Sequence, residues 1–142
     1  MKETLKKLVT SNIIGVEFTT HVPSCETVNA VEVALNCRLG KQMKEYLLSF
    51  GSLWKDSIEL YGVNEIQKLG SDLVKTTLNV AEYYDKMHEM VVIDNLGDGQ
   101  YVFCDQNDMI FKMPVEISAP PISLNIDLAH YLCARLNGET SF

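Results

Sequence analysis

The sequence predicts a single α+β domain, in which a mainly antiparallel sheet packs against helices from the amino-terminal half and one carboxy-terminal helix. A length of 142 residues suits one core, and the 46% apolar and 22% charged composition is that of an ordinary globular chain. Apolar residues recur at helical spacing in the first half, whereas residues 90–113 contain short strand-like runs separated by turn residues. Because the sequence contains no repeat or low-complexity segment, one domain spans residues 1–142.

Three helices are predicted before residue 52. Leu5 begins the first apolar pattern, and residues 13–18 follow as a brief strand or an extended entry. Ser24 can cap the second helix by accepting from its free backbone N–H groups. Gly51 ends the third helix. The inward stripes are Val28, Val31 and Leu35 in the second helix, and Met43, Tyr46, Leu47 and Phe50 in the third.

A strand and a surface helix are predicted next. Residues 57–61 alternate apolar and polar side chains, which is typical of a half-buried strand, and Gly62 ends it. Residues 69–84 then favour a helix whose apolar positions are Leu73, Leu78 and Ala81.

Residues 90–113 are the most informative stretch, because they predict a meander of three short strands. Residues 90–93 form an apolar run and residues 100–105 alternate. Residues 97–99 (Gly-Asp-Gly) and 105–108 (Asp-Gln-Asn-Asp) supply residues that tolerate turn dihedral angles.

A final helix is predicted after Pro120 and Pro121, which interrupt regular structure. Ser123 or Asn125 can cap this helix, which then runs to about Leu136. Its inward stripe is Leu124, Leu128, Tyr131 and Arg135, with Leu132 beside them.

The net charge of −7 is distributed unevenly. Residues 1–50 carry six basic and five acidic side chains, so the rest of the chain carries −8, and residues 82–108 carry seven acidic side chains against one lysine. A nucleic acid would be repelled by this segment, so no nucleic-acid partner is expected. Two interpretations remain: the carboxylates solvate turns and a helix face, or they form an acidic patch that docks a basic protein.

No motif for catalysis, metal binding or cofactor binding is found in the sequence. The four cysteines contain no C-x-x-C pair, which predicts buried free thiols. Residues 97–99 do not begin a dinucleotide fingerprint, because Val102 occupies the third glycine position and a strand follows. Residues 52–55 match the S-x-x-K pattern, in which a lysine helps to activate a serine nucleophile, but the S-D-N and K-T-G motifs that accompany this pattern are absent. We therefore expect no catalytic residue, no metal and no cofactor.

A cytoplasmic location without a membrane partner is expected. Polar residues 10–12 interrupt the apolar segment that follows the amino-terminal lysines, which argues against a signal peptide. No apolar run approaches the roughly 18 residues needed to cross a bilayer.

Residues 28–35, the tripeptide at 38–40 and residues 45–48 together resemble the opening of the SUKH superfamily, whose signature reads I-x-x-x-E-x-x-L, then L-P, aromatic-L and G. The matching positions are Glu32, Leu39, Tyr46, Leu47 and Gly51. This sequence departs from the pattern at Gly40, where the family usually has proline, and at Met43, where an aromatic residue is common. Later features follow in the same order, so the resemblance covers about residues 25–136.

The resemblance implies a binding module with no enzymatic activity. SUKH proteins are chiefly bacterial immunity proteins of polymorphic toxin systems, with related domains in yeast cell-wall regulators. This chain would then neutralise a cognate toxin domain, often a nuclease, through an acidic surface that meets a basic one. The carboxylates expected to face the partner are Asp56, Glu59, Asp94, Asp98, Asp105 and Asp108. The alternatives are an intracellular adaptor with another protein or peptide partner and, as a third class, a small hydrolase or ligand-binding enzyme.

Overall fold

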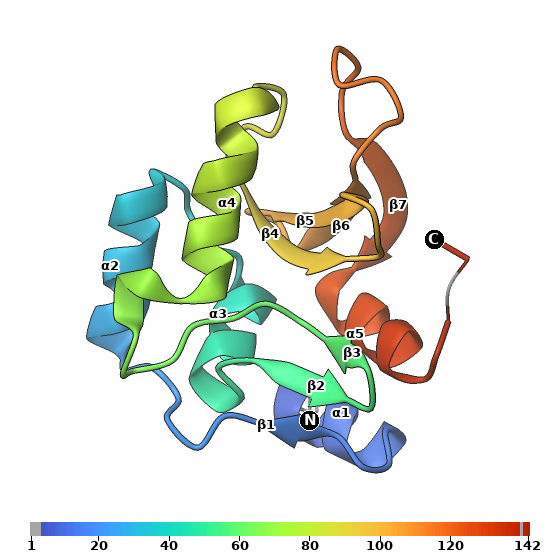
Figure 1. The fold of residues 1–142 in the computed structure, drawn as a ribbon. Helices are drawn as coiled ribbons and strands as arrows, with labels where there is room; N and C mark the ends of the chain where they lie inside the picture. The colour runs from blue at the N-terminus through green and yellow to red at the C-terminus, as the bar shows by residue number, and fades with distance from the viewer. Residues whose placement is uncertain (1–3, 140) are drawn as a thin grey trace.

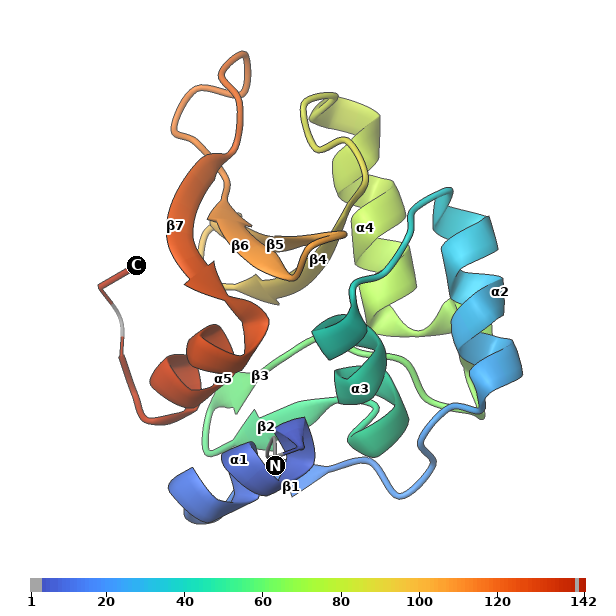
Figure 2. The same cartoon turned by 180° about the vertical axis from the view of Figure 1, so that it is seen from behind.

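A computed structural model describes residues 4–139 and 141–142, and within them five α-helices accompany two antiparallel sheets (Figures 1 and 2). The expected α+β class is therefore confirmed. Along the chain the elements are α1 (Leu5–Asn12), β1 (Glu17–Phe18), α2 (Cys25–Leu35), α3 (Lys41–Ser49), β2 (Leu53–Lys55), β3 (Ile58–Glu59), the short 3-10 helix η1 (Lys68–Gly70), α4 (Asp72–Tyr83), β4 (Met90–Asn95), β5 (Tyr101–Asp105), β6 (Met109–Lys112), β7 (Ile122–Asp127) and α5 (Leu128–Leu136).

The helices of the first half begin and end largely where local sequence signals place them. The Ser24 hydroxyl caps α2 by accepting from the Thr27 N–H at 3.2 Å, as predicted. After α3, the Gly51 N–H donates to the Leu47 carbonyl at 2.9 Å, and Gly51 adopts a left-handed φ of +73°. Gly62 lies so close to the Gly51 carbonyl that a Cβ atom at position 62 would collide with it. These two glycines thus let the end of α3 approach the chain that leaves β3.

The larger sheet has the order β4-β5-β6-β7 and buries side chains on both faces. Along β5, Val102 and Cys104 point into the main core, while Phe103 points into a second, smaller cluster. The main core lies towards α3 and α5 (Figure 1). The second cluster contains Val80, Tyr84, Met87, Val92, Phe103 and Met113, of which Val80 lies in α4 and Tyr84 directly follows it. The helix α4 therefore covers part of the face that points away from the main core.

The structure corrects the prediction for residues 122–127, which form strand β7 and not the start of a helix. Ile122, Leu124 and Ile126 alternate with polar residues, and this period of two suits a strand. The meander therefore has four strands, and α5 begins after Asp127, whose carboxylate caps it by accepting from the His130 N–H at 3.0 Å. The predicted inward positions at 128, 131 and 132 are confirmed as buried.

Two further differences concern β2 and α4. Residues 53–55 form a strand that the sequence analysis did not predict. In α4, Leu78 is 48% exposed and Ala81 is also exposed, so the predicted inward stripe is wrong beyond Leu73. The buried side chains of this helix are Leu73, Val74, Thr77 and Val80. The Thr77 hydroxyl accepts from the Val92 N–H at 2.9 Å, which joins α4 to the edge strand β4.

None of the helices in the described part of the chain has the length and apolar character needed to cross a bilayer.

Candidate partner-binding surface

The six carboxylates predicted to face a partner do not form one surface. Asp98 lies in the β4–β5 turn, whereas Asp105 and Asp108 lie at the β5–β6 turn. Successive turns of an antiparallel meander are at opposite ends of the strands. Because β5 has five residues, these two turns are separated by roughly 17 Å.

Asp94 points into the protein, which corrects its predicted role in contacting a partner. Its side chain is only 1% exposed and accepts hydrogen bonds from the Tyr131 hydroxyl at 2.6 Å and the Arg135 Nε at 2.8 Å. Both donors belong to α5, so this buried ion pair attaches the helix to the sheet. Burial and the adjacent Asp94 carboxylate raise the pKa of Tyr131 above its ordinary range, which keeps its phenol protonated as a donor.

A β-bulge explains why Asp94 is buried. The register of β4 against β5 shifts between Val92 and Asp94. Strict alternation would place Asp94 on the same face as Val92, which belongs to the second cluster. The extra residue, Ile93, lies in the main core, and the shift directs Asp94 towards α5.

Asp108 is also buried, and its predicted role at a partner surface is likewise corrected. The side chain is 7% exposed and accepts from the N–H groups of Gln42 and Met43, each at 2.9 Å. These donors lie in the first turn of α3, so Asp108 caps that helix from a distant part of the chain. Here a carboxylate in a turn stabilises a helix.

The other four predicted carboxylates reach solvent to different degrees. Asp56 in the β2–β3 turn, Glu59 in β3 and Asp98 are exposed. Asp105 is half-buried and holds its own turn, since one carboxylate oxygen accepts from the Asn107 and Met109 N–H groups at 2.9 Å. Asp56, Glu59 and Asp98 are therefore the members of the predicted set with the freest carboxylates.

A feature that the sequence analysis missed is a set of three tyrosines at the surface. The other three tyrosines of the chain are buried, whereas Tyr83 is 52% exposed and Tyr61 and Tyr101 are half-buried. Tyr83 ends α4, Tyr101 begins β5, and the N–H of Tyr61 donates to the Ile93 carbonyl of β4 at 2.9 Å. We call Tyr61, Tyr83 and Tyr101 the tyrosine face.

Within the tyrosine face, Tyr101 interacts with both Tyr61 and Tyr83. Burial, proximity to Tyr101 and a hydrogen bond with Tyr101 raise the pKa of Tyr83. Burial and the neighbouring Tyr101 also raise the pKa of Tyr61, and Asp72 and Asp94 add to that effect. The Tyr61 and Tyr83 phenols therefore stay protonated at neutral pH. Tyr61 and Tyr101 also pack against the second cluster, which supports them from below.

Acidic side chains border the tyrosine face. Asp72, the first residue of α4, accepts from the Gly62 N–H at 2.9 Å and is close enough to Tyr61 to affect its pKa. Burial raises the pKa of Asp72, and the nearby Glu59 carboxylate adds to that effect. Asp98 lies in the turn that leads directly into Tyr101. This surface thus combines aromatic rings with negative charge, a composition suited to binding a basic protein.

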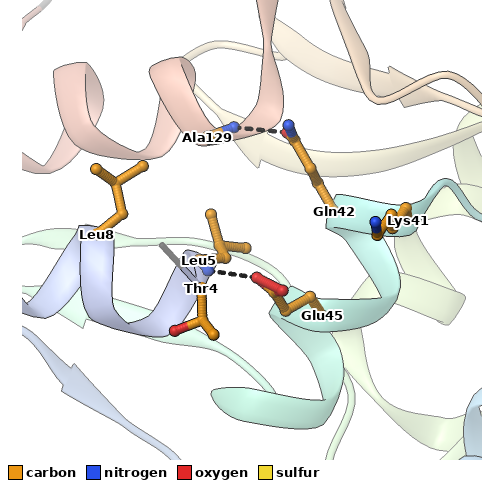
Figure 3. Close-up of a pocket in the computed structure, with 7 residues that line it drawn as sticks. All are labelled: Thr4, Leu5, Leu8, Lys41, Gln42, Glu45 and Ala129. Atoms are coloured by element: carbon orange, nitrogen blue, oxygen red, sulfur yellow. Dashed lines mark hydrogen bonds between the residues drawn. The ribbon is translucent and has the colours of Figure 1, made fainter. Parts of the chain in front are cut away.

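A cavity of about 310 Å³ between α1, α3 and α5 offers a concave alternative to this surface (Figure 3). Two helix-start N–H groups at its border are already paired: the Leu5 N–H donates to Glu45, and the Ala129 N–H donates to the Gln42 side chain at 3.0 Å. Gln42 also donates to Asp127 at 3.0 Å. The polar side chains at this site therefore hold three helices together.

A neighbouring cavity of about 270 Å³ is lined by His130 and Cys133 of α5. His130 Nδ1 lies 2.5 Å from the Asp127 carboxylate, so an acid, an imidazole and a thiol follow in order along the helix. Burial and the Asp127 charge raise the pKa of Cys133, which disfavours the thiolate that nucleophilic catalysis requires. The chemistry of this site therefore does not favour a cysteine nucleophile.

The four cysteines are free, as predicted, but only Cys37 and Cys104 are buried. Burial and nearby carboxylates raise the pKa of Cys37 to about 11, so its thiol is unreactive.

Comparison with protein families identifies the fold family. A family model described as SMI1-KNR4 cell-wall (SUKH_5) matches residues 1–117, which is most of the chain. The chain belongs to the SMI1-KNR4 family. This assignment confirms the SUKH resemblance that the residues of α2 and α3 indicated. No curated protein matches the sequence.

The structure gives physical roles to the SMI1-KNR4 signature residues in this chain. The Glu32 carboxylate accepts from the Leu39 N–H at 2.8 Å and pairs with Lys44 at 3.6 Å, so it fixes the connection between α2 and α3. Gly40, which replaces the usual proline, lies against the Asp108 carboxylate, and a Cβ atom would collide with it. Gly40 and Asp108 thus form a local unit of this family member, in which glycine makes room for the cap.

Proposed function

We propose that this chain is an immunity protein without enzymatic activity that binds and neutralises a cognate toxin domain in the cytoplasm of the producing cell. The observation that carries the proposal is membership of the SMI1-KNR4 family over residues 1–117. The SUKH superfamily to which the signature residues point consists chiefly of immunity proteins.

The charge of the chain supports a basic partner. The net charge is −7, and residues 82–108 hold seven of the acidic side chains. Toxins that bind nucleic acid need positively charged clefts, and electrostatic attraction steers an acidic inhibitor towards such a cleft before short-range contacts form. The binding residues that we propose are Asp56, Glu59 and Asp98, because these carboxylates of the predicted set are exposed.

Co-expression with a toxin tests this function directly. The probe is the toxin domain encoded by the gene next to the gene for this chain. Cells that express the toxin domain alone should stop growing, and co-expression of this chain should restore growth. The double variant Asp98→Lys and Glu59→Lys should lose protection, whereas Glu26→Gln, at an exposed position of α2, should retain it. Failure of the unaltered chain to restore growth would refute the proposal.

The family is described by a link to the cell wall, which favours a second candidate function, an intracellular regulatory adaptor with another protein partner. Gene context separates the two candidates. An adjacent gene for a large secreted protein with a variable carboxy-terminal domain supports immunity, and a neighbourhood of cell-wall genes supports the adaptor.

A further inference from the structure

We infer that the tyrosine face recognises arginine side chains of its protein partner, so that it selects arginine over lysine at equal charge. The inference deepens the proposed function and rests on it only in taking the partner to be a basic protein. It assigns the aromatic component of binding to Tyr61, Tyr83 and Tyr101, and the electrostatic component to the carboxylates around them.

The distribution of tyrosines is the first support. Tyr46, Tyr84 and Tyr131 are fully buried with 1% exposure or less, and each donates a hydrogen bond from its hydroxyl group to an acceptor within the protein. The remaining tyrosines lie together although they are far apart in the sequence: Tyr61 and Tyr101 both pack against the second cluster, and Tyr83 ends the helix that supplies Val80 to that cluster. Tyrosine supplies a large, rigid contact area with little loss of conformational entropy, and it is enriched at protein interfaces.

The rigidity of the site is the second support. Tyr61 and Tyr101 pack against the second cluster, in which the rings of Tyr84 and Phe103 stack with centroids 5.9 Å apart. The Tyr84 hydroxyl donates to the Ala119 carbonyl at 2.8 Å, so the end of α4 is also joined to the β6–β7 connection. Figure 1 shows these two segments rising on either side of the sheet. The rings are thus presented on a preformed scaffold.

The charge around the rings specifies the partner. Asp72 lies beside Tyr61, Glu59 lies near Asp72, and Asp98 lies in the turn before Tyr101, so negative charge near the rings attracts cations. A guanidinium group can stack flat on a phenol ring while it donates hydrogen bonds to a carboxylate, whereas an ammonium group acts mainly as a point charge. Aromatic rings beside carboxylates therefore favour arginine over lysine.

Two repeat peptides of equal length and charge, arginine–glycine and lysine–glycine, provide the test. They are titrated at low salt into the full-length, isotope-labelled protein, and binding is followed by backbone NMR signals. The arginine peptide should bind about threefold to tenfold more tightly. The largest signal changes should fall at Tyr61, Tyr83 and Tyr101.

Variants separate stacking from charge. Tyr83→Ala should remove most of the preference for arginine, Tyr83→Phe should keep it, and Leu78→Ala should leave it unchanged. Leu78 is the matched control because it lies on the same helix and is 48% exposed. Asp98→Asn should weaken both peptides alike. The NMR spectrum of each variant reports whether it is folded.

The inference would be overturned if the two peptides bound equally or if neither bound. It would also be overturned if the signal changes were confined to the β5–β6 turn. A preference for arginine that survives Tyr83→Ala would do the same. Growth protection by the unaltered chain does not depend on these outcomes, so the proposed function and this inference can fail separately.

Discussion

The β4–β5 and β5–β6 turns belong to the same meander, and each places an aspartate in the left-handed region, with φ of 52° at Asp98 and 63° at Asp108. Asp98 is exposed, whereas Asp108 is buried and caps α3. The difference arises because the first turn of α3 meets one turn and not the other. Residue type and local conformation therefore do not distinguish a carboxylate that holds the fold from one that is free to bind.

Asp94 is the more buried of the two carboxylates, Asp94 and Asp108, that point into the protein. Its replacement should therefore have the largest effect on stability. Replacing Asp94 with alanine leaves Arg135 without its carboxylate partner and removes the acceptor of the Tyr131 hydroxyl. We expect the free energy of unfolding to fall by about 3–5 kcal/mol in urea denaturation. A loss below about 1 kcal/mol would show that the buried pair does not attach α5 to the sheet.

Gly40→Ala should have the next largest effect. The added Cβ atom would collide with the Asp108 carboxylate and displace the cap. We expect about 2–3 kcal/mol of destabilisation, because overpacking and loss of the cap act together. In the Asp108→Ala background the same substitution should cost clearly less. Equal costs in both backgrounds, measured by a double-mutant cycle, would contradict the coupling of the two residues.

Asp108→Ala should lower the free energy of unfolding by about 2 kcal/mol, because two N–H groups of α3 lose their acceptor. Asp98→Ala is the matched control at the other turn and should change stability by less than about 0.5 kcal/mol. Urea denaturation of both variants checks the comparison. Similar losses of unfolding free energy in the two variants would contradict the distinction between the buried Asp108 and the exposed Asp98.

The pH dependence of stability should reveal a smaller contribution from Asp127. Burial raises its pKa, but hydrogen bonds from Gln42 and His130 outweigh burial, so the pKa lies below the ordinary value of 3.8. Asp127 therefore stabilises the fold at pH values above 3.8, and this contribution is lost as the pH falls through the lower folded-state pKa.

Asp127→Asn tests the direction of this pH dependence. The destabilisation that the variant causes should be largest near neutral pH and should shrink as the pH falls below 3.8. Unfolding free energies of both proteins across this range provide the measurement. A difference that grows on acidification would mean that the carboxyl group is stabilised in its protonated form.

Local signals in the sequence predicted the parts of the fold that depend on near neighbours. Ser24 starts α2 and Gly51 follows α3 because capping needs only adjacent residues. The positions of Asp94 and Asp108 depend on a bulge and on a helix 65 residues away, which no local pattern encodes. The tyrosine face was missed for the same reason, since its members come from α4, β5 and the chain that follows β3. The signal available in the sequence was Tyr83, an aromatic residue outside the inward stripe predicted for residues 69–84.

The most direct test of the division between inward and outward carboxylates is the association rate with the toxin domain, measured against salt concentration. Asp98→Asn and Asp105→Asn each remove one charge, at opposite ends of β5. The proposed interface predicts that Asp98→Asn slows association and weakens its salt dependence, while Asp105→Asn has a smaller effect, since charges beyond a Debye length of roughly 10 Å are screened. A larger effect of Asp105→Asn, or a rate that does not respond to salt, would contradict it.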